Sequence, residues 1–174
     1  MYLVASSLDG FIATEDHDLD WLLQFDPHEP TNPYAEFIEN VGAIAMGART
    51  YDWLLARDEG GWPYGALPCW VFTHHDRPRK DGANLHFTEA DVREVHAEML
   101  AAAGDRDVWL VGGGELVGQF LDHELVDALW VSITPVLLGS GAPLLPRRRC
   151  RPMHVVDVRH GPGRPFVHVL YSLR

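Results

Sequence analysis

The sequence predicts an α/β fold built on a mixed, mostly parallel sheet, with helices on both faces and an antiparallel hairpin at the C-terminal end. Short apolar runs of strand length alternate with segments of helical periodicity through most of the chain. The last two runs follow one another with only a short loop between them. A length of 174 residues with 47% hydrophobic residues suits a single core, so we expect one domain over residues 1–174.

The predicted strands are apolar runs bounded by turn residues or by the start of a helix. Those in the first two thirds of the chain are followed by helix or turn signals, which is typical of parallel strands. The last two are joined by Gly161-Pro162-Gly163 and therefore form the hairpin. The predicted strands are Tyr2–Ser6, Gly42–Met46, Pro68–Thr73, Leu85–Phe87, Asp107–Val111, Ala128–Thr134, His154–Arg159 and Phe166–Ser172.

The helix with the clearest boundaries is predicted over Thr88–Ala103. Thr88 can cap it, Asp91 stands at the capping-box distance, and Gly104 can end it. Its apolar residues recur at helical spacing. Further helices are predicted over Tyr34–Asn40, Thr50–Leu55 and Glu115–Leu121.

Composition limits the possible functions. A formal net charge of -11 gives no general attraction to nucleic acid or to an anionic membrane, so neither is an expected partner. Cys69 and Cys150 form no disulfide framework, and the histidines show no zinc-binding motif, so no metal site is expected. The first residues lack a signal-peptide pattern and no segment has the length of a membrane span, which predicts a cytoplasmic protein.

A triple glycine, Gly112-Gly113-Gly114, follows one predicted strand and opens a predicted helix at Glu115. Glycines let a backbone approach a ligand closely, and the free N–H groups of a helix N-terminus attract phosphate. The pattern is not the Rossmann fingerprint, because Val117 stands where a further glycine would be needed. By itself the motif fits a phosphate-binding turn and a ligand-free turn equally well.

A second turn of this kind begins at Gly47, after the strand Gly42–Met46, with Arg49 and Thr50 at the start of the next helix. Guanidinium, hydroxyl and backbone N–H groups can converge there on phosphate oxygens. Two such turns at one sheet edge favour a dinucleotide as ligand.

Polar residues also follow two other strands. Thr73, His74, His75 and Arg77 either complete a pocket for a 2′-phosphate or form a solvated turn. Asp9, just past the first strand, is a candidate to contact substrate, although Asp-Gly is equally a common turn dipeptide.

Six segments that span nearly the whole chain carry a family resemblance. They are Ser6–Ala13, Asp20–Leu22, Met46–Tyr51, Val108–Gly114, Leu125–Leu129 and Thr134–Leu144. In this order they resemble the dihydrofolate reductase superfamily, and most closely the branch similar to the reductase domain of bacterial riboflavin-biosynthesis enzymes.

The resemblance implies a three-layer dihydrofolate-reductase-like fold with NADPH across the carboxyl edge of the sheet. It implies that Leu8 and Asp9 border the substrate and that Trp21 lies in a loop over the pocket. It also implies a cis peptide between Gly112 and Gly113, and a homodimer. The expected cofactor-binding residues are Gly47, Arg49, Thr50, Thr73, His74, Gly112, Gly113, Gly114 and Glu115.

Two departures from the family pattern bear on function. The family usually has Arg directly after the glycine of the cofactor turn, where this chain has Ala48. Dihydrofolate reductases carry an acidic residue on the first helix, and the corresponding stretch here, from Thr31-Asn32 onward, has no carboxylate until Glu36. A buried carboxylate paired with a ring is hard to replace with neutral groups, so dihydrofolate is disfavoured as the substrate.

The sequence therefore predicts an NADPH-dependent oxidoreductase that transfers a hydride to a small pyrimidine or pteridine, similar to ribosylaminouracil reductase or to dihydrofolate reductase. Asp9 and Glu36 are the catalytic candidates, and Leu8, Asp9 and Trp21 are the substrate candidates. The alternative is a non-catalytic nucleotide-binding or sensor protein on the same fold, which Ala48 and the missing helix carboxylate favour.

Overall fold

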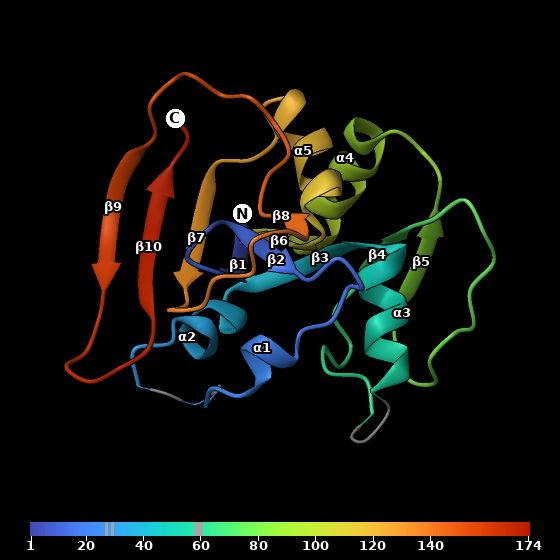
Figure 1. The fold of residues 1–174 in the computed structure, drawn as a ribbon. Coiled ribbons are helices and arrows are strands. Elements are labelled where there is room, and N and C mark those ends of the chain that lie inside the picture. The colour runs from blue at the N-terminus through green and yellow to red at the C-terminus, as the bar shows by residue number, and fades with distance from the viewer. Residues whose placement is uncertain (27, 29, 58–60) are drawn as a thin grey trace. The chain divides into compact units, whose positions relative to one another are not determined.

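The computed structural model describes residues 1–26, 28, 30–57 and 61–174 (Figure 1). The chain divides into two compact units, which we call the first unit, residues 1–39 with 126–174, and the second unit, residues 40–125. The expectation of a single domain stays a prediction.

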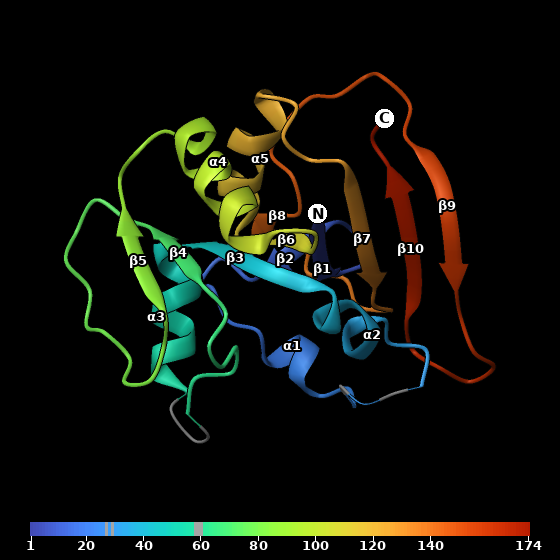
Figure 2. The ribbon, with the colours of Figure 1, turned by 180° about the vertical axis from the view of Figure 1, so that it is seen from behind.

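The second unit is a parallel sheet with helices on both faces. Its strands lie in the order β5-β4-β3-β6 and each neighbouring pair is parallel. Helices α4 and α5 cover one face and α3 the other (Figures 1 and 2). The elements are β3 (Val41–Gly47), α3 (Ala48–Ala56), β4 (Cys69–Phe72), β5 (Leu85–Thr88), α4 (Val92–Ala103), β6 (Asp107–Gly112) and α5 (Gly114–Asp122).

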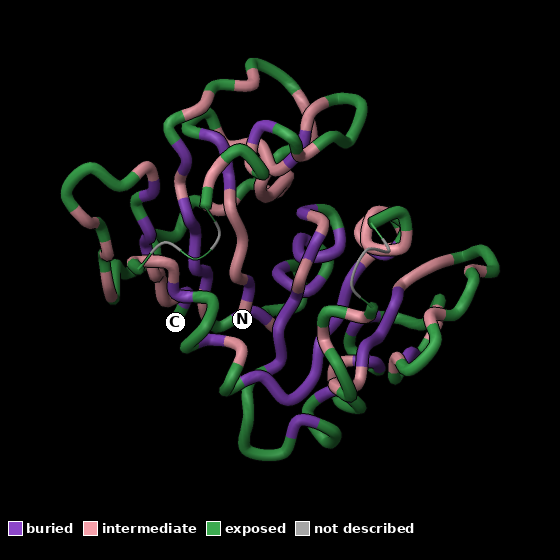
Figure 3. Tube along the Cα trace, turned by 90° about the horizontal axis from the view of Figure 1, so that it is seen from below, coloured by how far each residue is buried: buried purple, intermediate pink, exposed green. Residues whose placement is uncertain are grey.

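The central strand β3 shows why this sheet is parallel and apolar. All of its residues except Gly47 are buried, as a strand covered on both faces requires (Figure 3). Gly42 on this strand lets α4 approach closely. A β-carbon at Gly42 would lie 2.6 Å from the carbonyl oxygen of Ala103 and 2.7 Å from its Cα atom.

The first unit is a mixed sheet that ends in the predicted hairpin. Strand β1 pairs with β7 in parallel, and β10 pairs antiparallel with both β7 and β9. The short strands β2 and β8 pair separately. The elements are β1 (Tyr2–Ser6), β2 (Phe11–Ala13), α1 (Asp20–Leu23), α2 (Tyr34–Glu39), β7 (Ala128–Ile133), β8 (Ala142–Pro143), β9 (His154–Arg159) and β10 (Val167–Ser172).

The predicted α/β class, the parallel strands and the C-terminal hairpin are confirmed, and the largest error in a helix boundary lies at the start of α4. Helix α4 begins at Val92, not at Thr88, and its N-cap is Asp91, whose carboxylate accepts the N–H of Arg93 at 2.9 Å. Thr88 instead ends β5, where it pairs with Phe72. Strand pairing, which no local capping pattern reveals, therefore decides where the helix starts.

Three short elements, α1, β2 and β8, were not predicted, because two to four residues carry no readable period. No helix in the described part of the chain is long and apolar enough to cross a membrane.

Candidate functional site

Two helix N-termini lie side by side in the second unit. Helices α3 and α5 follow β3 and β6 directly, with Gly47 and Gly113 as N-caps in extended conformation. Neither N-cap makes a side-chain capping bond, whereas Asp91 caps α4. A β-carbon on Gly47 would lie 3.8 Å from the oxygen of Gly112 and 3.9 Å from the nitrogen of Gly113. Uncapped N–H groups from two nine-residue helices therefore stand together, as an anion site requires.

The peptide bond between Gly112 and Gly113 is cis, as the family resemblance implies. Gly112 has a φ of 131°, a conformation that L side chains rarely adopt. The expectation that this peptide lies beside a pyrophosphate stays a prediction.

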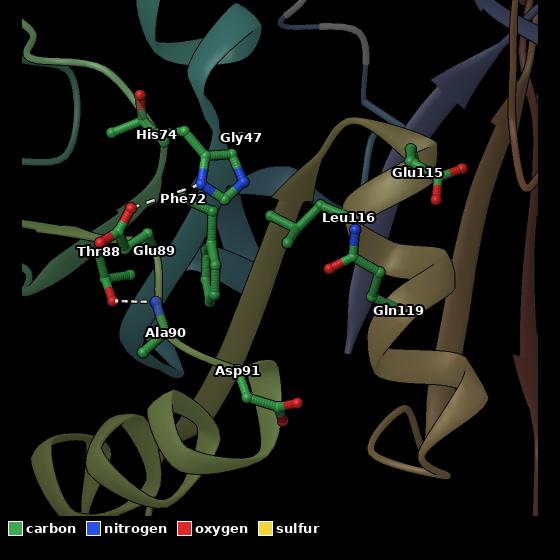
Figure 4. A pocket seen from close by; sticks show the side chains of 11 residues that line it. Gly47, Phe72, His74, Thr88, Glu89, Ala90, Asp91, Glu115, Leu116 and Gln119 are labelled. Atoms are coloured by element: carbon green, nitrogen blue, oxygen red, sulfur yellow. Dashed lines mark hydrogen bonds and ion pairs between the residues drawn. The ribbon is translucent and has the colours of Figure 1, made fainter.

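A pocket of about 360 Å³ lies next to these turns (Figure 4). Phe72 and Leu116 provide apolar walls from β4 and α5. Four of the predicted cofactor-binding residues line it: Gly47, Thr73, His74 and Glu115. The remaining lining residues are Thr88, Glu89, Ala90, Asp91 and Gln119.

Two other predicted cofactor-binding residues, Arg49 and Thr50, lie in the first turn of α3. Arg49 is exposed. Arg77, which was considered for a 2′-phosphate pocket, instead pairs with Asp52 of α3 at 2.8 Å. His75 forms a local turn with Thr73, whose hydroxyl accepts its N–H at 3.1 Å.

Carboxylates dominate the charge of the pocket. Glu89 lies 3.6 Å from His74, and both side chains are largely exposed. Asp91 pairs with Arg93 at 2.8 Å, and hydrogen bonds from Arg93 lower the pKa of Asp91 to about 2. Glu115 occupies the first turn of α5. The chemistry of the pocket thus combines an anion-attracting backbone with an acidic rim.

In the first unit, the carboxylate of Asp9 ties two loops together. It accepts hydrogen bonds from the hydroxyl of Ser7 at 2.6 Å and from the N–H groups of Leu138 and Gly139 at 3.1 and 2.7 Å. These hydrogen bonds lower the pKa of Asp9, and the bond from Ser7 has the largest effect. Asp9 is therefore ionised near neutral pH and suited to accept hydrogen bonds rather than to donate a proton. Leu8 beside it is exposed, and its N–H donates to Val136 at 2.8 Å.

The second catalytic candidate, Glu36 on α2, accepts a hydrogen bond from Arg159 of β9 at 2.8 Å. Arg159 also pairs with Asp157 at 2.9 Å and lies 4.8 Å above the ring of Trp130. Glu36 thus links α2 to the hairpin, and its catalytic role stays a prediction.

Trp21, the third substrate candidate, is buried on α1. Its indole N–H has no acceptor within the residues that the structure describes, and the same holds for Trp130. A buried donor without a protein acceptor is a position that water or a ligand can satisfy. The expectation that Trp21 contacts the substrate stays a prediction.

One buried polar pair of the first unit was not predicted from the sequence. Ser132 on β7 and His168 on β10 lie opposite each other, with 2.7 Å between the hydroxyl oxygen and Nδ1. Both are buried, and the ring of Phe166 stacks on His168 at 5.6 Å. The sequence signal that could have indicated this pair is a polar residue at an inward position of an otherwise apolar strand, as Ser132 is on β7 and His168 on β10.

The second unit thus has the features of an α/β domain that holds a phosphate-bearing ligand at the carboxyl ends of its parallel strands. The model of the RibD C-terminal domain matches residues 1–160, and the chain belongs to this family. The predicted resemblance to the reductase domain of riboflavin-biosynthesis enzymes is confirmed, and the fold is that of dihydrofolate reductase.

Two Bacillus subtilis proteins, the uncharacterised YwjB and YyaP, are similar to this chain. YwjB is 34% identical over 141 residues, which is 81% of this chain and 79% of YwjB. YyaP is 27% identical over 150 residues, which is 81% of this chain and 77% of YyaP.

Solved structures share the fold. A Shewanella sp. PV-4 protein provisionally assigned to riboflavin biosynthesis has a TM-score of 0.80 at 26% identity, over 98% of this chain and 96% of its own. The diaminohydroxyphosphoribosylaminopyrimidine deaminase/reductase of Thermotoga maritima has a TM-score of 0.64 at 19% identity, over 98% and 55%. Dihydrofolate reductase of Enterococcus faecalis, complexed with NADP(H), has 0.60 at 17%, over 98% and 94%. At these identities the last two show the fold alone.

Proposed function

We propose that this chain is a reductase that transfers a hydride from a reduced nicotinamide dinucleotide to a small heterocyclic substrate. NADPH is the dinucleotide that the family resemblance implies. The observation that carries the proposal is the pair of uncapped helix N-termini at Gly47 and Gly113, next to a pocket in a member of the RibD C-terminal domain family.

The residues present fit the diphosphate of such a dinucleotide. The first turns of α3 and α5 offer backbone N–H groups without side-chain caps, and Arg49 adds an exposed cation to one of them. The residues that would hold the diphosphate are Gly47, Arg49, Thr50, Gly112, Gly113 and Gly114. Thr73, His74 and Glu115 line the pocket and would contact the adenosine side. When bound, the reduced nicotinamide supplies the hydride.

The proposed substrate residues, Leu8, Asp9 and Trp21, belong to the first unit. Leu8 offers an exposed apolar side chain and Trp21 a buried indole N–H that can donate to a carbonyl of a heterocycle. Asp9 holds the loop that carries Leu8, through its bonds to Leu138 and Gly139. In this proposal Asp9 positions the substrate loop as an ionised acceptor, and Glu36 fixes α2 through Arg159.

Two observations support the proposed substrate class: the family of the chain, and the lack of the helix carboxylate that dihydrofolate reductases carry. The matching Thermotoga maritima protein is, by its name, a 5-amino-6-(5-phosphoribosylamino)uracil reductase, which acts on a pyrimidine. From Thr31 onward the chain has no carboxylate until Glu36 for a pterin ring. We therefore place a pyrimidine of the riboflavin pathway ahead of dihydrofolate.

A non-catalytic nucleotide-binding or sensor protein is the second candidate function. The observation that favours it is that both carboxylate candidates are already engaged, Asp9 by three hydrogen-bond donors and Glu36 by Arg159. Such a protein would bind the dinucleotide in the same pocket without oxidising it.

A homodimer and a cytoplasmic location belong to the same proposal. Strand β9 is an outer strand of the first unit's sheet, and its Val155, Val156 and Val158 are 60%, 59% and 55% exposed. An exposed apolar edge strand pairs readily with another chain, and the resemblance implies a second copy as that chain. Cys69 and Cys150 are free thiols, which suits a reducing compartment.

The proposal is tested first by binding. NADPH and NADH are each titrated against the protein while tryptophan fluorescence is followed. The absorbance of bound NADPH is then monitored with dihydrofolate, a ribosylaminopyrimidine and simple quinones. Oxidation by the ribosylaminopyrimidine supports the reductase, and saturable binding without oxidation by any acceptor supports the sensor. If neither dinucleotide binds saturably, both functions are wrong.

A further inference from the structure

One face of the first unit's sheet carries buried polar groups among apolar ones. Trp130 and Ser132 stand two residues apart on β7, so their side chains lie on the same face. On β10, Leu170 pairs with Trp130 and His168 with Ser132, whose hydroxyl oxygen lies 2.7 Å from the Nδ1 atom of the histidine. Helix α2 lies over this face, because Arg159 joins the two: its guanidinium carbon lies 4.8 Å from the centre of the Trp130 ring, and the same group donates to a carboxylate of α2 at 2.8 Å.

Helix α1 lies against the same face. Phe25, which follows the C-cap of α1, packs edge-on against Phe166 with 5.3 Å between the ring centres. Phe166 in turn stacks on His168 at 5.6 Å. Trp21 precedes Phe25 by one helical turn, so the two side chains lie on one side of the helix. Trp21 therefore belongs to the layer between α1 and the face that carries Trp130.

This face ends at the edge where the proposed substrate residues lie. Strands β1 and β7 are parallel, and Ser132 pairs with Ala5, each one residue before the end of its strand. The loop that carries Leu8 and Asp9 follows β1 directly. Ligands of open α/β sheets bind beyond the carboxyl ends of the parallel strands, which is this edge.

Two indole N–H groups of this layer are buried without a hydrogen-bond partner in the described part of the chain. They belong to Trp21 and Trp130, whose side chains are 8% and 7% exposed. Trp70, a comparably buried tryptophan of the second unit, instead donates to Glu98 at 3.2 Å. An unsatisfied buried donor costs free energy, and most buried polar groups are satisfied. Two such donors next to the ligand edge are expected where a ligand supplies the acceptors.

The chemistry of the indole group restricts that ligand. An indole N–H can donate a hydrogen bond but cannot accept one. The two carbonyl oxygens of a pyrimidine-2,4-dione are acceptors, whereas amino groups at the same ring positions are donors and would leave the indoles unpaired. A site built to form a hydrogen bond rejects an analogue that cannot form it.

We infer that Trp130 and Trp21 donate their indole N–H groups to carbonyl oxygens of the pyrimidine, which makes Trp130 a specificity-determining residue. This inference rests on the proposed function, because it concerns the substrate end of the same site. Both nitrogens are shielded from solvent, so the ring reaches them when α1 moves away from the sheet. Helix α1 has four residues and no side-chain cap, and a helix this short is only marginally stable.

The test observes the indole groups directly. The probes are 5,6-diaminouracil, which is a 2,4-dione, and 2,4,5,6-tetraaminopyrimidine, which has amino groups in place of both carbonyls. Proton–nitrogen NMR spectra of the isotope-labelled chain are recorded during each titration, and the indole resonances are assigned from single Trp→Phe variants. Calorimetry measures the binding of both probes and of NADPH to the wild-type chain, Trp21→Phe and Trp130→Phe.

Two controls match these variants. Trp70→Phe is the same substitution at a buried indole whose acceptor is Glu98. Tyr2→Phe removes a buried hydroxyl that also has no partner among the described residues, but Tyr2 pairs with Leu129 and so lies on the opposite face of the sheet. Circular dichroism confirms that each variant is folded.

Diaminouracil is expected to bind about tenfold more tightly than tetraaminopyrimidine and to shift the indole resonances of Trp21 and Trp130. Trp130→Phe and Trp21→Phe each weaken diaminouracil about tenfold and leave NADPH binding unchanged, and the controls change neither. The inference is overturned if the wild-type Trp130 resonance does not move, if Trp130→Phe binds diaminouracil as the wild type does, or if tetraaminopyrimidine binds equally well. It is also overturned if neither pyrimidine binds. The NADPH titration decides the proposed function separately, because it does not depend on either probe.

Discussion

Replacing Gly47 by serine tests directly whether the start of α3 is kept free for a ligand. Gly47 has a φ of -81° and a ψ of 163°, which is the extended conformation of an ordinary N-cap. A serine hydroxyl there would accept the N–H of Arg49 or Thr50, the groups that the proposed diphosphate needs. A serine cap stabilises a helix by about 0.5–2 kcal/mol relative to alanine.

Gly47→Ala is the matched control, because it adds the same β-carbon without the hydroxyl. That carbon would meet its nearest neighbours at 3.8 and 3.9 Å, which is ordinary van der Waals contact. We therefore expect the serine variant to be more stable than the alanine variant by about 1 kcal/mol, which for a chain of this length shifts Tm by roughly 2–4 °C.

Ligand binding should change in the opposite direction. In the serine variant an internal acceptor competes for the N–H group, so NADH and NADPH should each bind about tenfold more weakly than to the alanine variant, equivalent to about 1.4 kcal/mol. Urea denaturation and fluorescence titration measure the two effects on the same samples. If the serine variant gains stability and binds both dinucleotides as well as the alanine variant, the N–H groups of α3 do not hold the ligand.

Four further substitutions test other parts of the structure. Gly42→Ala should destabilise the second unit by about 1–3 kcal/mol in urea, because its β-carbon overlaps backbone atoms that cannot move aside. Arg49→Ala should weaken NADH and NADPH equally, by about tenfold in calorimetry, because Arg49 adjoins the proposed diphosphate site and not the ribose pocket. Asp9→Asn should lower the free energy of unfolding at neutral pH, and this loss should disappear in acid. The pKa of Asp9 is lowered in the folded state, so its ionised form stabilises the fold above about pH 4. This contribution is lost as the pH falls through the lowered pKa. Ser132→Ala should cost about 1–3 kcal/mol in urea, because it leaves a nitrogen of the buried His168 without that hydroxyl.

Each of these predictions has an outcome that would contradict it. Unchanged stability of Gly42→Ala would mean that α4 shifts freely on β3. A loss of NADPH binding alone in Arg49→Ala would place Arg49 at a 2′-phosphate. A deficit of Asp9→Asn that persists in acid would show that its loop contacts do not depend on ionisation. If Ser132→Ala is as stable as the wild-type protein, the hydroxyl contributes nothing that the buried His168 needs.

The parts of the fold that depend on local patterns could be predicted from the sequence. The buried strand β3 and the hairpin of β9 and β10 follow from apolar runs and turn residues. The start of α4 could not be read in this way. Thr88 has a good capping side chain, but its pairing with Phe72 across β5 and β4 holds it in a strand. The competing interaction comes from another part of the chain, and a local rule contains no information about it.

The features of the candidate site that depend on adjacent residues could likewise be predicted, and those that depend on the strand order could not. The glycine turns at Gly47 and Gly113 were predictable, because each motif combines a strand end with a helix start in a few adjacent residues. The arrangement of the acidic residues around the pocket was not predictable in this way. Glu89 follows β5, and Glu115 lies on α5, which follows β6; strands β4 and β3 lie between β5 and β6 in the sheet order. Glu115 was expected at the cofactor site from its place after the glycine turn, but only the strand order brings Glu89 to the same pocket, and no local pattern contains that information.

The comparison of the three longer helices of the second unit gives the strongest physical reason to place a ligand at the two turns. The carboxylate of Asp91 caps helix α4 by accepting the N–H of Arg93, and polar N-caps of this kind are preferred in helices. Helices α3 and α5 have glycine at the same position, although a serine there would fit without strain at Gly47. Each missing cap leaves about 1 kcal/mol of stability unrealised. The two adjacent helices lack a side-chain cap and the third helix has one, which is expected if an external anion takes the place of the cap at the first two. A serine cap introduced at Gly47 should therefore stabilise the fold and, at the same time, weaken the binding of the ligand.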